Sequence, residues 1–286
     1  MSIINCKELV SARKIRLAAD VQSSGFTANT LAVIQVGDNQ ASNSYIKGKE
    51  KDRQEIGIAF QHIKLPVEID TDSVISVINT LNITKQVAGI IVQLPLPPHL
   101  DTEKIINSVA DEKDVDGFKP ASQFTPCTPL GIMSILDDIS YSVLGKTVCV
   151  IGQGKTVGKP LFELLTKAGA TVISCNSKTP HDKLLKFIKE CDVLVTAAGK
   201  AGMISKANFW HQGEKRYIFP DVIIDVGINR DENGKLCGDC AKDLWEENLL
   251  ITPVPGGVGL YTRISLMENT YLASLAQQSD IDNEQI

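Results

Sequence analysis

Short apolar runs alternate along the chain with longer stretches in which apolar residues recur at helical spacing. The runs TLAVIQV, IAFQHIKL and VAGIIVQL lie in the first part of the chain, and KTVCVIG, ATVISC, CDVLVTAAG and VIIDVG follow Pro129. Runs of this length, rich in β-branched residues, predict strands, and the stretches between them predict helices. The alternation predicts an α/β protein whose parallel sheets are covered by helices on both faces.

The segment GFKPASQFTPCTP interrupts this alternation with prolines and small polar residues, which predicts a domain boundary near residues 120–127. We expect a first α/β domain over residues 1–122 and a second domain, a Rossmann-like doubly wound parallel sheet, over residues 123–263. The stretch RISLMENTYLASLAQQ again has apolar residues at helical spacing. It predicts a final helix within residues 264–286 that packs back on the first domain and completes it.

Composition narrows the class of protein. The 286 residues are 43% hydrophobic and 22% charged, which is ordinary for a globular protein of two domains. The net charge of −5, without a basic block, argues against a nucleic-acid partner. The start MSIINCKELVSARK lacks the apolar core of a signal peptide, and no apolar run approaches membrane-spanning length, so we expect a cytoplasmic protein without a membrane partner.

Seven cysteines are an odd number in a chain that needs no disulfides, which fits a reducing compartment. Cys237 and Cys240 form one CxxC pair, but no second Cys or His pair at zinc-finger spacing accompanies it. We therefore predict no metal site, and we interpret the two cysteines as small residues on either side of a Gly-Asp turn.

Tyr45 and Lys49 are four residues apart in ASNSYIKGKEK, so a helix places them on one face. A lysine whose pKa is lowered by burial can carry a proton, and a neighbouring phenol can orient a substrate or water. The spacing alone favours a solvated charged face instead, because the neighbours are mostly charged: Lys47, Glu50, Lys51 and Asp52.

Three further stretches place polar or flexible residues where predicted strands end. Gln93, in VQLPLPP, follows a strand and is either a ligand-binding amide or a structural residue of the sheet edge. Asp114 and Asp116, in DEKDVDGF, precede a glycine and either bind a ligand or close a turn. The stretch ITPVPGGVGLYT combines prolines and glycines after a strand, which predicts a rigid loop whose backbone can approach a ligand.

The stretch IGQGKTVGKP fits neither common phosphate-binding pattern. A P-loop needs a glycine at the position of Cys149, and the glycines at 152, 154 and 158 give GxGxxxG rather than GxGxxG. The stretch follows a predicted strand and precedes a predicted helix, and the start of a helix can bind a phosphate. The pattern of glycines alone does not decide whether this one does.

In their order along the chain, SYIKGK, VQLPLP, KDVDGF, PCTP, IDVGIN, NGKLCGD and TPVPGGVG resemble the methylenetetrahydrofolate dehydrogenase/methenyltetrahydrofolate cyclohydrolase family. The resemblance extends over nearly the whole chain. It implies a cleft between a folate-binding domain and a dinucleotide-binding domain. It also implies two reactions of one-carbon metabolism, which supply purine biosynthesis: oxidation of 5,10-methylenetetrahydrofolate, and hydrolysis of the methenyl product to 10-formyltetrahydrofolate.

The resemblance also implies roles for particular residues. Lys49, Tyr45, Gln93 and Asp116 would be catalytic, with Gln93 the partner of the lysine and Asp116 the carboxylate that binds the pterin ring. The residues that would bind the folate substrate are Tyr45, Asp116, Pro255, Gly256 and Gly257. The residues that would bind the cofactor are Gly152, Gln153, Gly154, Gly158, Ser177 and Ile228.

Gln153 and Gly154 replace an Arg and a Ser that the family usually carries, and that Arg helps to hold the 2′-phosphate of NADP. A neutral amide cannot supply the charge of a guanidinium. The following CNSKT has no Asp or Glu for the ribose of NAD, and Ser177 and Lys178 can face a phosphate. We expect NADP, with NAD as the alternative.

The resemblance further implies tetrahydrofolate derivatives as partners and a homodimer. Two other readings stay open. The chain could carry a single activity, as a folate dehydrogenase or another two-domain NAD(P)-dependent dehydrogenase, or it could be a regulator that binds folate or nucleotide without turnover. A binder has no need of Lys49.

Overall fold

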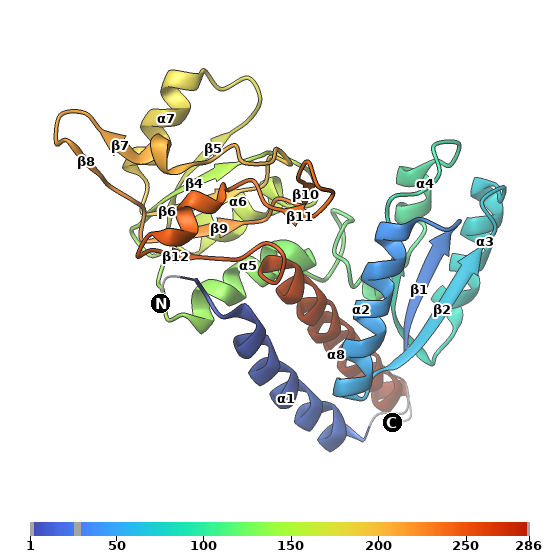
Figure 1. Ribbon diagram of the computed structural model, residues 1–286. Helices are drawn as coiled ribbons and strands as arrows, with labels where there is room; N and C mark the ends of the chain where they lie inside the picture. The colour runs from blue at the N-terminus through green and yellow to red at the C-terminus, as the bar shows by residue number, and fades with distance from the viewer. Residues whose placement is uncertain (1–2, 26–29, 285–286) are drawn as a thin grey trace. The chain divides into compact units, whose positions relative to one another are not determined.

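The computed structural model of the chain describes residues 3–25 and 30–284. The chain forms two compact α/β units, which are described separately (Figure 1). Unit 1 contains the chain up to Val10 and Thr128–Thr262, and unit 2 contains Ser11–Cys127 and the helical residues from Arg263 on. The predicted α/β class is confirmed.

Unit 2 is built on a parallel sheet with the strand order β2-β1-β3. Its strands are β1 (Thr30–Val36), β2 (Ala59–Leu65) and β3 (Val87–Val92). The strands β1 and β3 are almost entirely buried, as their continuous apolar sequences predict, whereas the edge strand β2 alternates between exposed and half-buried residues. The chain leaves β1 for β2 on one side and then returns across β1 to β3.

The helices of unit 2 connect and cover these strands: α2 (Gln40–Ile56), α3 (Thr71–Ile83), α4 (Thr102–Asn107) and the short 3₁₀ helix η1 (Asp111–Lys113). The start of α3 is set by Asp70, whose side chain accepts a hydrogen bond from the backbone N–H of Ser73 at 2.7 Å. The helix buries Val74, Ile78 and Leu81, at the spacing of one helical face, against the apolar core of the sheet.

Unit 1 contains a five-stranded parallel sheet with the order β12-β9-β6-β4-β5. The strands are β4 (Thr147–Ile151), β5 (Thr171–Cys175), β6 (Val193–Thr196), β9 (Val222–Asp225) and β12 (Leu250–Ile251). The chain runs outward from β4 to β5 and then crosses back over β4 to β6, which is the doubly wound arrangement. The predicted Rossmann-like sheet is therefore confirmed.

The connections of unit 1 include two helices, two further 3₁₀ helices and two short hairpins: α6 (Gly158–Lys167), α7 (His181–Glu190), η2 (Lys206–Phe209), η3 (Lys242–Glu246), β7 (Trp210–His211) with β8 (Arg216–Tyr217), and β10 (Asn229–Arg230) with β11 (Leu236–Cys237). The segment that begins at Trp210 forms the β7–β8 hairpin.

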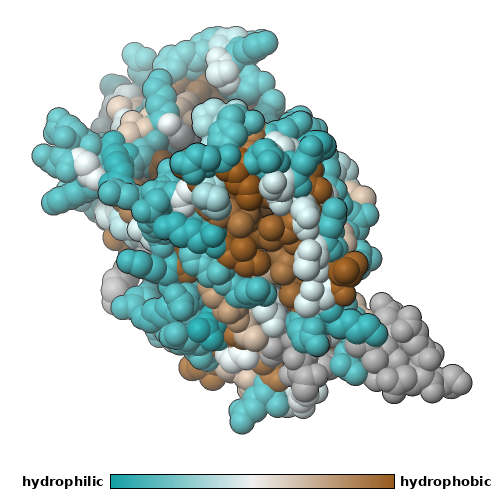
Figure 2. Space-filling view, turned by 90° about the vertical axis from the view of Figure 1, so that its right-hand side faces the viewer, coloured by the Kyte–Doolittle hydropathy of each residue, from teal (hydrophilic) through white to brown (hydrophobic). Residues whose placement is uncertain are grey.

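Three helices contain the points at which the chain passes from one unit to the other: α1 (Cys6–Ser24), α5 (Cys127–Asp138) and α8 (Val258–Glu284). None of the described helices has the length and apolar character that a membrane span requires. The face drawn in Figure 2 is mostly hydrophilic, and its largest apolar area lies near the centre.

The core of unit 1 gives a test of the fold. Leu194, in β6, is 0% exposed and belongs to the apolar cluster of this unit. Leu194→Ala should lower the free energy of unfolding of unit 1 by about 2–5 kcal/mol, because the shorter side chain leaves a cavity. Both tryptophans of the chain, Trp210 and Trp245, lie in unit 1, so their fluorescence in urea reports the unfolding of this unit.

The matched control is Leu144→Ala, since Leu144 lies in the same unit and is 74% exposed. This variant should stay within about 0.5 kcal/mol of the parent. Equal losses in the two variants would contradict the place of Leu194 in the core.

Candidate functional site

Lys49 lies on the buried face of α2. Its side chain is buried, with 8% of the residue exposed, although most of its charged neighbours on the helix are exposed. The ammonium Nζ donates a hydrogen bond to Oε1 of Gln93 at 3.0 Å. Lys49 therefore does not lie on a solvated charged face, which its charged neighbours in the sequence had favoured.

Gln93 is the first residue after β3, at the carboxyl end of that strand. Its backbone N–H continues the sheet by donating to the carbonyl of Ile34 at 2.8 Å. Its side-chain Nε2 donates to the carbonyl of Leu94 at 2.8 Å, which leaves Oε1 directed at Lys49. The backbone of Gln93 continues the sheet edge and its side chain holds the lysine, whereas ligand binding by this amide stays a prediction.

Asp116 and Cys127 complete the surroundings of the Lys49 ammonium. Burial lowers the pKa of Lys49, and the charge of Asp116 offsets part of this effect. Burial raises the pKa of the Asp116 carboxyl, and the charge of Lys49 works in the opposite direction. The pKa of the Cys127 thiol is raised well above its usual value, first by burial and then by Asp116. Lysine and carboxylate are each shifted toward the neutral form, which suits groups that exchange a proton with a ligand.

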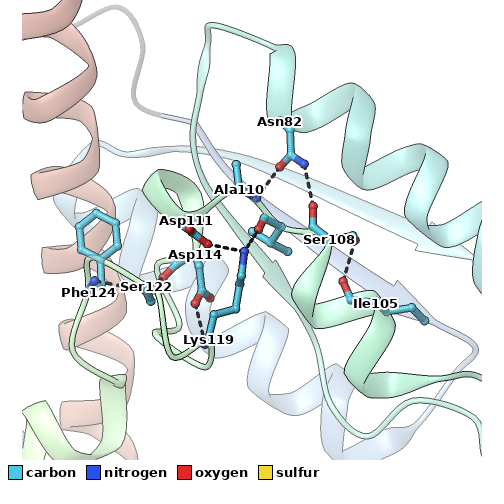
Figure 3. A network of polar contacts seen from close by, with 10 residues as sticks. Asn82, Ile105, Ser108, Ala110, Asp111, Asp114, Lys119, Ser122 and Phe124 are labelled. Atoms are coloured by element: carbon cyan, nitrogen blue, oxygen red, sulfur yellow. Dashed lines mark hydrogen bonds and ion pairs between the residues drawn. The ribbon is translucent and has the colours of Figure 1, made fainter.

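The loop that carries Asp116 is fixed by its neighbour Asp114 (Figure 3). The Asp114 side chain accepts from the backbone N–H of Lys119 at 3.0 Å, and its carbonyl accepts from Oγ of Ser122 at 3.0 Å. The Lys119 ammonium bonds the carbonyl of Val109 and the carboxylate of Asp111. Asp114 is thus the carboxylate that closes the turn, and Asp116 is left to face Lys49.

Two residues that the sequence reasoning missed, Asp52 on α2 and Arg263 on α8, join these helices through an ion pair. Asp52 is 1% exposed and forms ion pairs with Lys14, from α1, and with Nε of Arg263, from α8, at 2.8 Å. A side chain on Gly48 would meet Nη1 of Arg263 at 2.0 Å, so the glycine makes room for the guanidinium. The spacing of three residues between Lys49 and Asp52 indicates that both lie on the same side of a helix. No sequence pattern indicates that Asp52 pairs with Arg263.

Tyr45 is half-buried on the same helix. Burial raises the pKa of its phenol, and the charge of Arg263 lowers it. Tyr45, Lys49, Gln93 and Asp116 all belong to unit 2, so the structure places the four predicted catalytic residues in one unit.

The predicted cofactor residues lie in unit 1, beginning at the end of β4. Gly152 has φ of +114°, and a Cβ there would lie 2.2 Å from the carbonyl oxygen of Ala197. A Cβ on Gly158 would lie 1.9 Å from the carbonyl oxygen of Gly152. Both positions need glycine because of close packing. A Cβ on Gly154 would meet no atom within 4 Å, so the backbone there stays open to approach by a ligand.

The helix α6 begins at Gly158 directly after this turn. Its N-cap residue is Val157, and no side chain provides a capping hydrogen bond. The first N–H groups of a helix attract anions when no side chain satisfies them. At the start of α6, Pro160 has no N–H, and the N–H groups of Lys159 and Leu161 donate to the carbonyls of Gly154 at 3.2 Å and Val157 at 2.9 Å. Binding of a pyrophosphate would therefore depend on the N–H of Gly158 and on the preceding turn.

Gln153 extends from the turn to the end of β5. Its Nε2 donates to Oγ of Ser174 at 3.0 Å, and its Oε1 accepts from Nδ2 of Asn176 at 2.9 Å. Ser177 and Lys178 follow on the same loop and are exposed. Ile228, beyond the end of β9, is 56% exposed, as several other large apolar residues of the described chain are.

Pro255, Gly256 and Gly257 form the turn between β12 and α8. Gly256 has φ of +102°, and a Cβ on Gly257 would lie 2.4 Å from the carbonyl oxygen of Pro253. These residues belong to unit 1, so the predicted folate-binding residues are divided between the two units. Among the described residues, no group of His, Cys, Asp or Glu is arranged to hold a metal ion.

One α/β unit contains a buried lysine near a carboxylate, and the other has the doubly wound sheet and glycine turn that are typical of dinucleotide-binding domains. These features are typical of an enzyme with two domains that uses a dinucleotide. The catalytic-domain model of the tetrahydrofolate dehydrogenase/cyclohydrolase family matches residues 4–116, and the NAD(P)-binding-domain model of the same family matches residues 126–278. The chain belongs to this family.

Relatives match over nearly the full length. A bifunctional protein FolD of Lysinibacillus sphaericus is 42% identical over 96% of this chain and 97% of its own. The crystal structure of the bifunctional methylenetetrahydrofolate dehydrogenase/cyclohydrolase from Campylobacter jejuni is similar with a TM-score of 0.87 and 36% identity, over 96% of this chain and 99% of that chain. The corresponding Trypanosoma brucei enzyme, solved with NADP cofactor and an inhibitor, has a TM-score of 0.86 and 28% identity, over 96% and 98%.

The ion pairs of Asp52 with Lys14 and Arg263 give a testable prediction for this site. Asp52→Asn removes the charge shared by Lys14 and Arg263, whose side chains are 15% and 21% exposed. We expect unit 2 to lose about 3 kcal/mol of stability, the lower end of the range for a broken buried pair, because both cations keep some contact with water. Differential scanning calorimetry of the full chain measures this loss.

The control is Glu55→Gln. Glu55 bonds the same Lys14 at 2.7 Å, but its side chain is 42% exposed. Exposed pairs contribute about 1 kcal/mol or less, so this variant should melt close to the parent. If the two variants melt together, Asp52 does not anchor α2.

Proposed function

We propose that this chain carries out both reactions of its family at residues that the structure describes. It oxidises 5,10-methylenetetrahydrofolate to the methenyl form with NADP, and it hydrolyses the methenyl form to 10-formyltetrahydrofolate. The observation that carries the proposal is the buried Lys49 ammonium, held by Gln93 at 3.0 Å and influenced by the charge of Asp116. The names of the bifunctional relatives support the two activities.

Lys49 is the proton carrier of the proposal. An isolated buried ammonium is unfavourable unless acceptors or charges compensate it. Gln93 supplies one acceptor, and an ammonium has three donors, so donors remain for a substrate oxygen or for water. The lowered pKa of Lys49 favours the neutral amine, which can accept the proton that water loses when it attacks the methenyl carbon.

Asp116 and Tyr45 would bind and orient the pterin side of the substrate. The Asp116 carboxylate would accept hydrogen bonds from ring N–H donors, and Tyr45 presents a half-buried phenol on α2, the helix that also carries Lys49. The family resemblance also assigns substrate binding to Pro255, Gly256 and Gly257, which belong to unit 1.

The cofactor residues fit NADP. When bound, NADP supplies the acceptor for the hydride. The N–H groups of the glycine turn and of Gly158 would hold the pyrophosphate, and the exposed Ile228 would contact the cofactor through apolar surface. Ser177 and Lys178 would hold the 2′-phosphate. Gln153 carries no charge and already bonds Ser174 and Asn176, so we expect a modest rather than absolute preference for NADP.

The alternatives are less well supported. A regulator that only binds folate or nucleotide would gain nothing from a buried lysine that costs stability. A dehydrogenase without hydrolase activity would not need a proton carrier at Lys49, since the hydride goes to the cofactor.

We further propose a homodimer in the cytoplasm, in the one-carbon metabolism that supplies purine biosynthesis. All seven cysteines are free, which fits a reducing compartment. The dimer follows from the family resemblance, and light scattering of the purified chain tests it.

Absorbance tests both activities on the purified chain. Reduction of NADP in the presence of methylenetetrahydrofolate reports the dehydrogenase, and decay of the methenyl chromophore without cofactor reports the cyclohydrolase. A chain with neither signal is not the proposed enzyme, and a chain with one signal is monofunctional.

Lys49→Gln should abolish cyclohydrolase activity while folate binding largely survives, because the change removes the proton carrier and keeps most of the side-chain length. The rate of methenyltetrahydrofolate hydrolysis and a folate-binding titration measure the two effects. Lys47→Gln, at an exposed position of the same helix, is the control and should behave as the parent. Hydrolysis at the parent rate by the Lys49 variant would exclude Lys49 as the proton carrier.

Gln153→Arg should strengthen NADP binding by about 1.5–3 kcal/mol, the value of one charge-assisted contact, and leave NAD nearly unchanged. The measurement is the ratio of kcat/KM for the two cofactors in parent and variant. Gln86→Arg adds the same charge at an exposed position of unit 2 and should leave the ratio unchanged. A parent that strongly prefers NAD, or a ratio that does not move, would show that residue 153 does not contact the phosphate.

A further inference from the structure

Two loops meet at the carboxyl edge of the unit 1 sheet, at the point where the strand order reverses. β4 pairs with β5 on one side and with β6 on the other. Ligands of doubly wound sheets bind in the crevice outside the strand ends at this switch point. The two loops are residues 152–157, after β4, and residues 197–200, after β6. We call them the glycine turn and the 197–200 loop.

The two loops are in direct contact. The N–H of Ala197 donates to the carbonyl of Ile151 at 2.7 Å. A Cβ on Gly152 would lie only 2.2 Å from the carbonyl oxygen of Ala197. A displacement of the 197–200 loop would therefore be transmitted to the glycine turn.

Asp239 holds the 197–200 loop. Its Oδ2 accepts from the backbone N–H groups of Ala198 at 2.7 Å and Gly199 at 3.2 Å. Its Oδ1 accepts from the N–H of Lys200 at 2.7 Å and from Nδ2 of Asn229 at 2.9 Å. Asp239 is 0% exposed, so these four donors take the place of water around a buried carboxylate.

Asp239 is itself fixed by a second buried carboxylate. Oδ1 of Asp225 accepts from the N–H groups of Asp239 and Gly227, each at 3.0 Å. A Cβ on Gly238 would lie 1.9 Å from Oδ2 of Asp225, and one on Gly227 would lie 2.3 Å from Oδ1 of Asp239. The IDVGIN and CGDC stretches of the sequence thus form one assembly.

We propose that Asp239 is a positioning residue for the dinucleotide. It fixes the 197–200 loop as one wall of the crevice at the switch point, and through Ala197 and Gly152 it fixes the glycine turn. This inference rests on the proposed NADP-dependent function. Asp239 touches no reacting atom, and it lies in a different unit from Lys49, so its loss should affect the cofactor and spare the hydrolysis.

The test compares the full-length Asp239→Asn variant with the parent. In Asp239→Asn, an NH₂ group replaces one acceptor oxygen and cannot accept from the backbone N–H groups of the loop. In the ligand-free variant, hydrogen–deuterium exchange of residues 198–200 should therefore become faster. NADPH, titrated by its fluorescence, should bind about tenfold more weakly, the equivalent of one charge-assisted hydrogen bond. Cyclohydrolase kcat/KM, measured without cofactor, should stay within about twofold, a difference too small to represent such a contact.

Asp243→Asn is the matched control. Asp243 accepts from the backbone N–H of Lys206 at 3.1 Å in the same unit, away from the glycine turn. This variant should match the parent in loop exchange, NADPH affinity and hydrolysis.

Each outcome decides the inference. Unchanged NADPH affinity in a folded Asp239→Asn variant overturns it, as does an equal loss of both activities. If that variant fails to fold by circular dichroism, Asn229→Ala removes only the contact to Oδ1 and should shift exchange and affinity in the same direction; no shift overturns the inference. A parent that does not bind NADPH refutes the proposed cofactor instead, whereas the exchange measurement still reports whether Asp239 holds the loop.

Discussion

The burial of one ammonium group constrains the whole of unit 2. Lys49 loses most of its contact with water on the inner face of α2, and this is unfavourable unless acceptors and opposite charge replace the water. Gln93 can provide the acceptor only because β3 ends directly before it, and Asp116 can provide the charge only because Asp114 fixes the loop. Strand length, loop closure and helix packing are therefore all required to stabilise a single side chain.

The same reversal of strand order positions the predicted site residues in both units. In unit 2 the chain returns across β1 between β2 and β3, and in unit 1 it returns across β4 between β5 and β6. Such a reversal separates the loops at the carboxyl edge and leaves a crevice between them. Gln93 follows the strand on one side of the first reversal, and Gly152 and Ala197 border the second. Short-range sequence features acquire a function at these edges because the topology brings them together.

The sequence predicted those features that depend on local periodicity and spacing. The buried strands read as continuous apolar runs, and the four-residue spacing of Tyr45 and Lys49 correctly placed both on one helix. The burial of Lys49 could not be predicted, because it depends on packing against distant elements. The ion pair of Asp52 with Arg263 joins residues far apart in the chain, and no local pattern reports it. The passages after Val10 and Thr262 fall inside continuous helices, where helical periodicity gives no signal of a boundary, whereas the passage after Cys127 lies at the start of α5, next to the proline-containing segment that interrupts the alternation.

The buried carboxylates differ in how many hydrogen-bond donors surround their oxygens. This difference distinguishes the carboxylates that hold a loop in place from the one that can take part in catalysis. Asp239 accepts from three backbone N–H groups and an amide, and Asp225 accepts from the backbone of Gly227, Asp239 and Cys240. Such donors occupy the oxygens and hold a loop in one conformation. Asp116 instead faces an amine and a thiol, and both its own pKa and that of Lys49 are displaced toward the neutral forms. A carboxylate saturated by backbone donors has no capacity left for a ligand, whereas Asp116 keeps that capacity because the neighbouring Asp114 has taken over the closure of the turn.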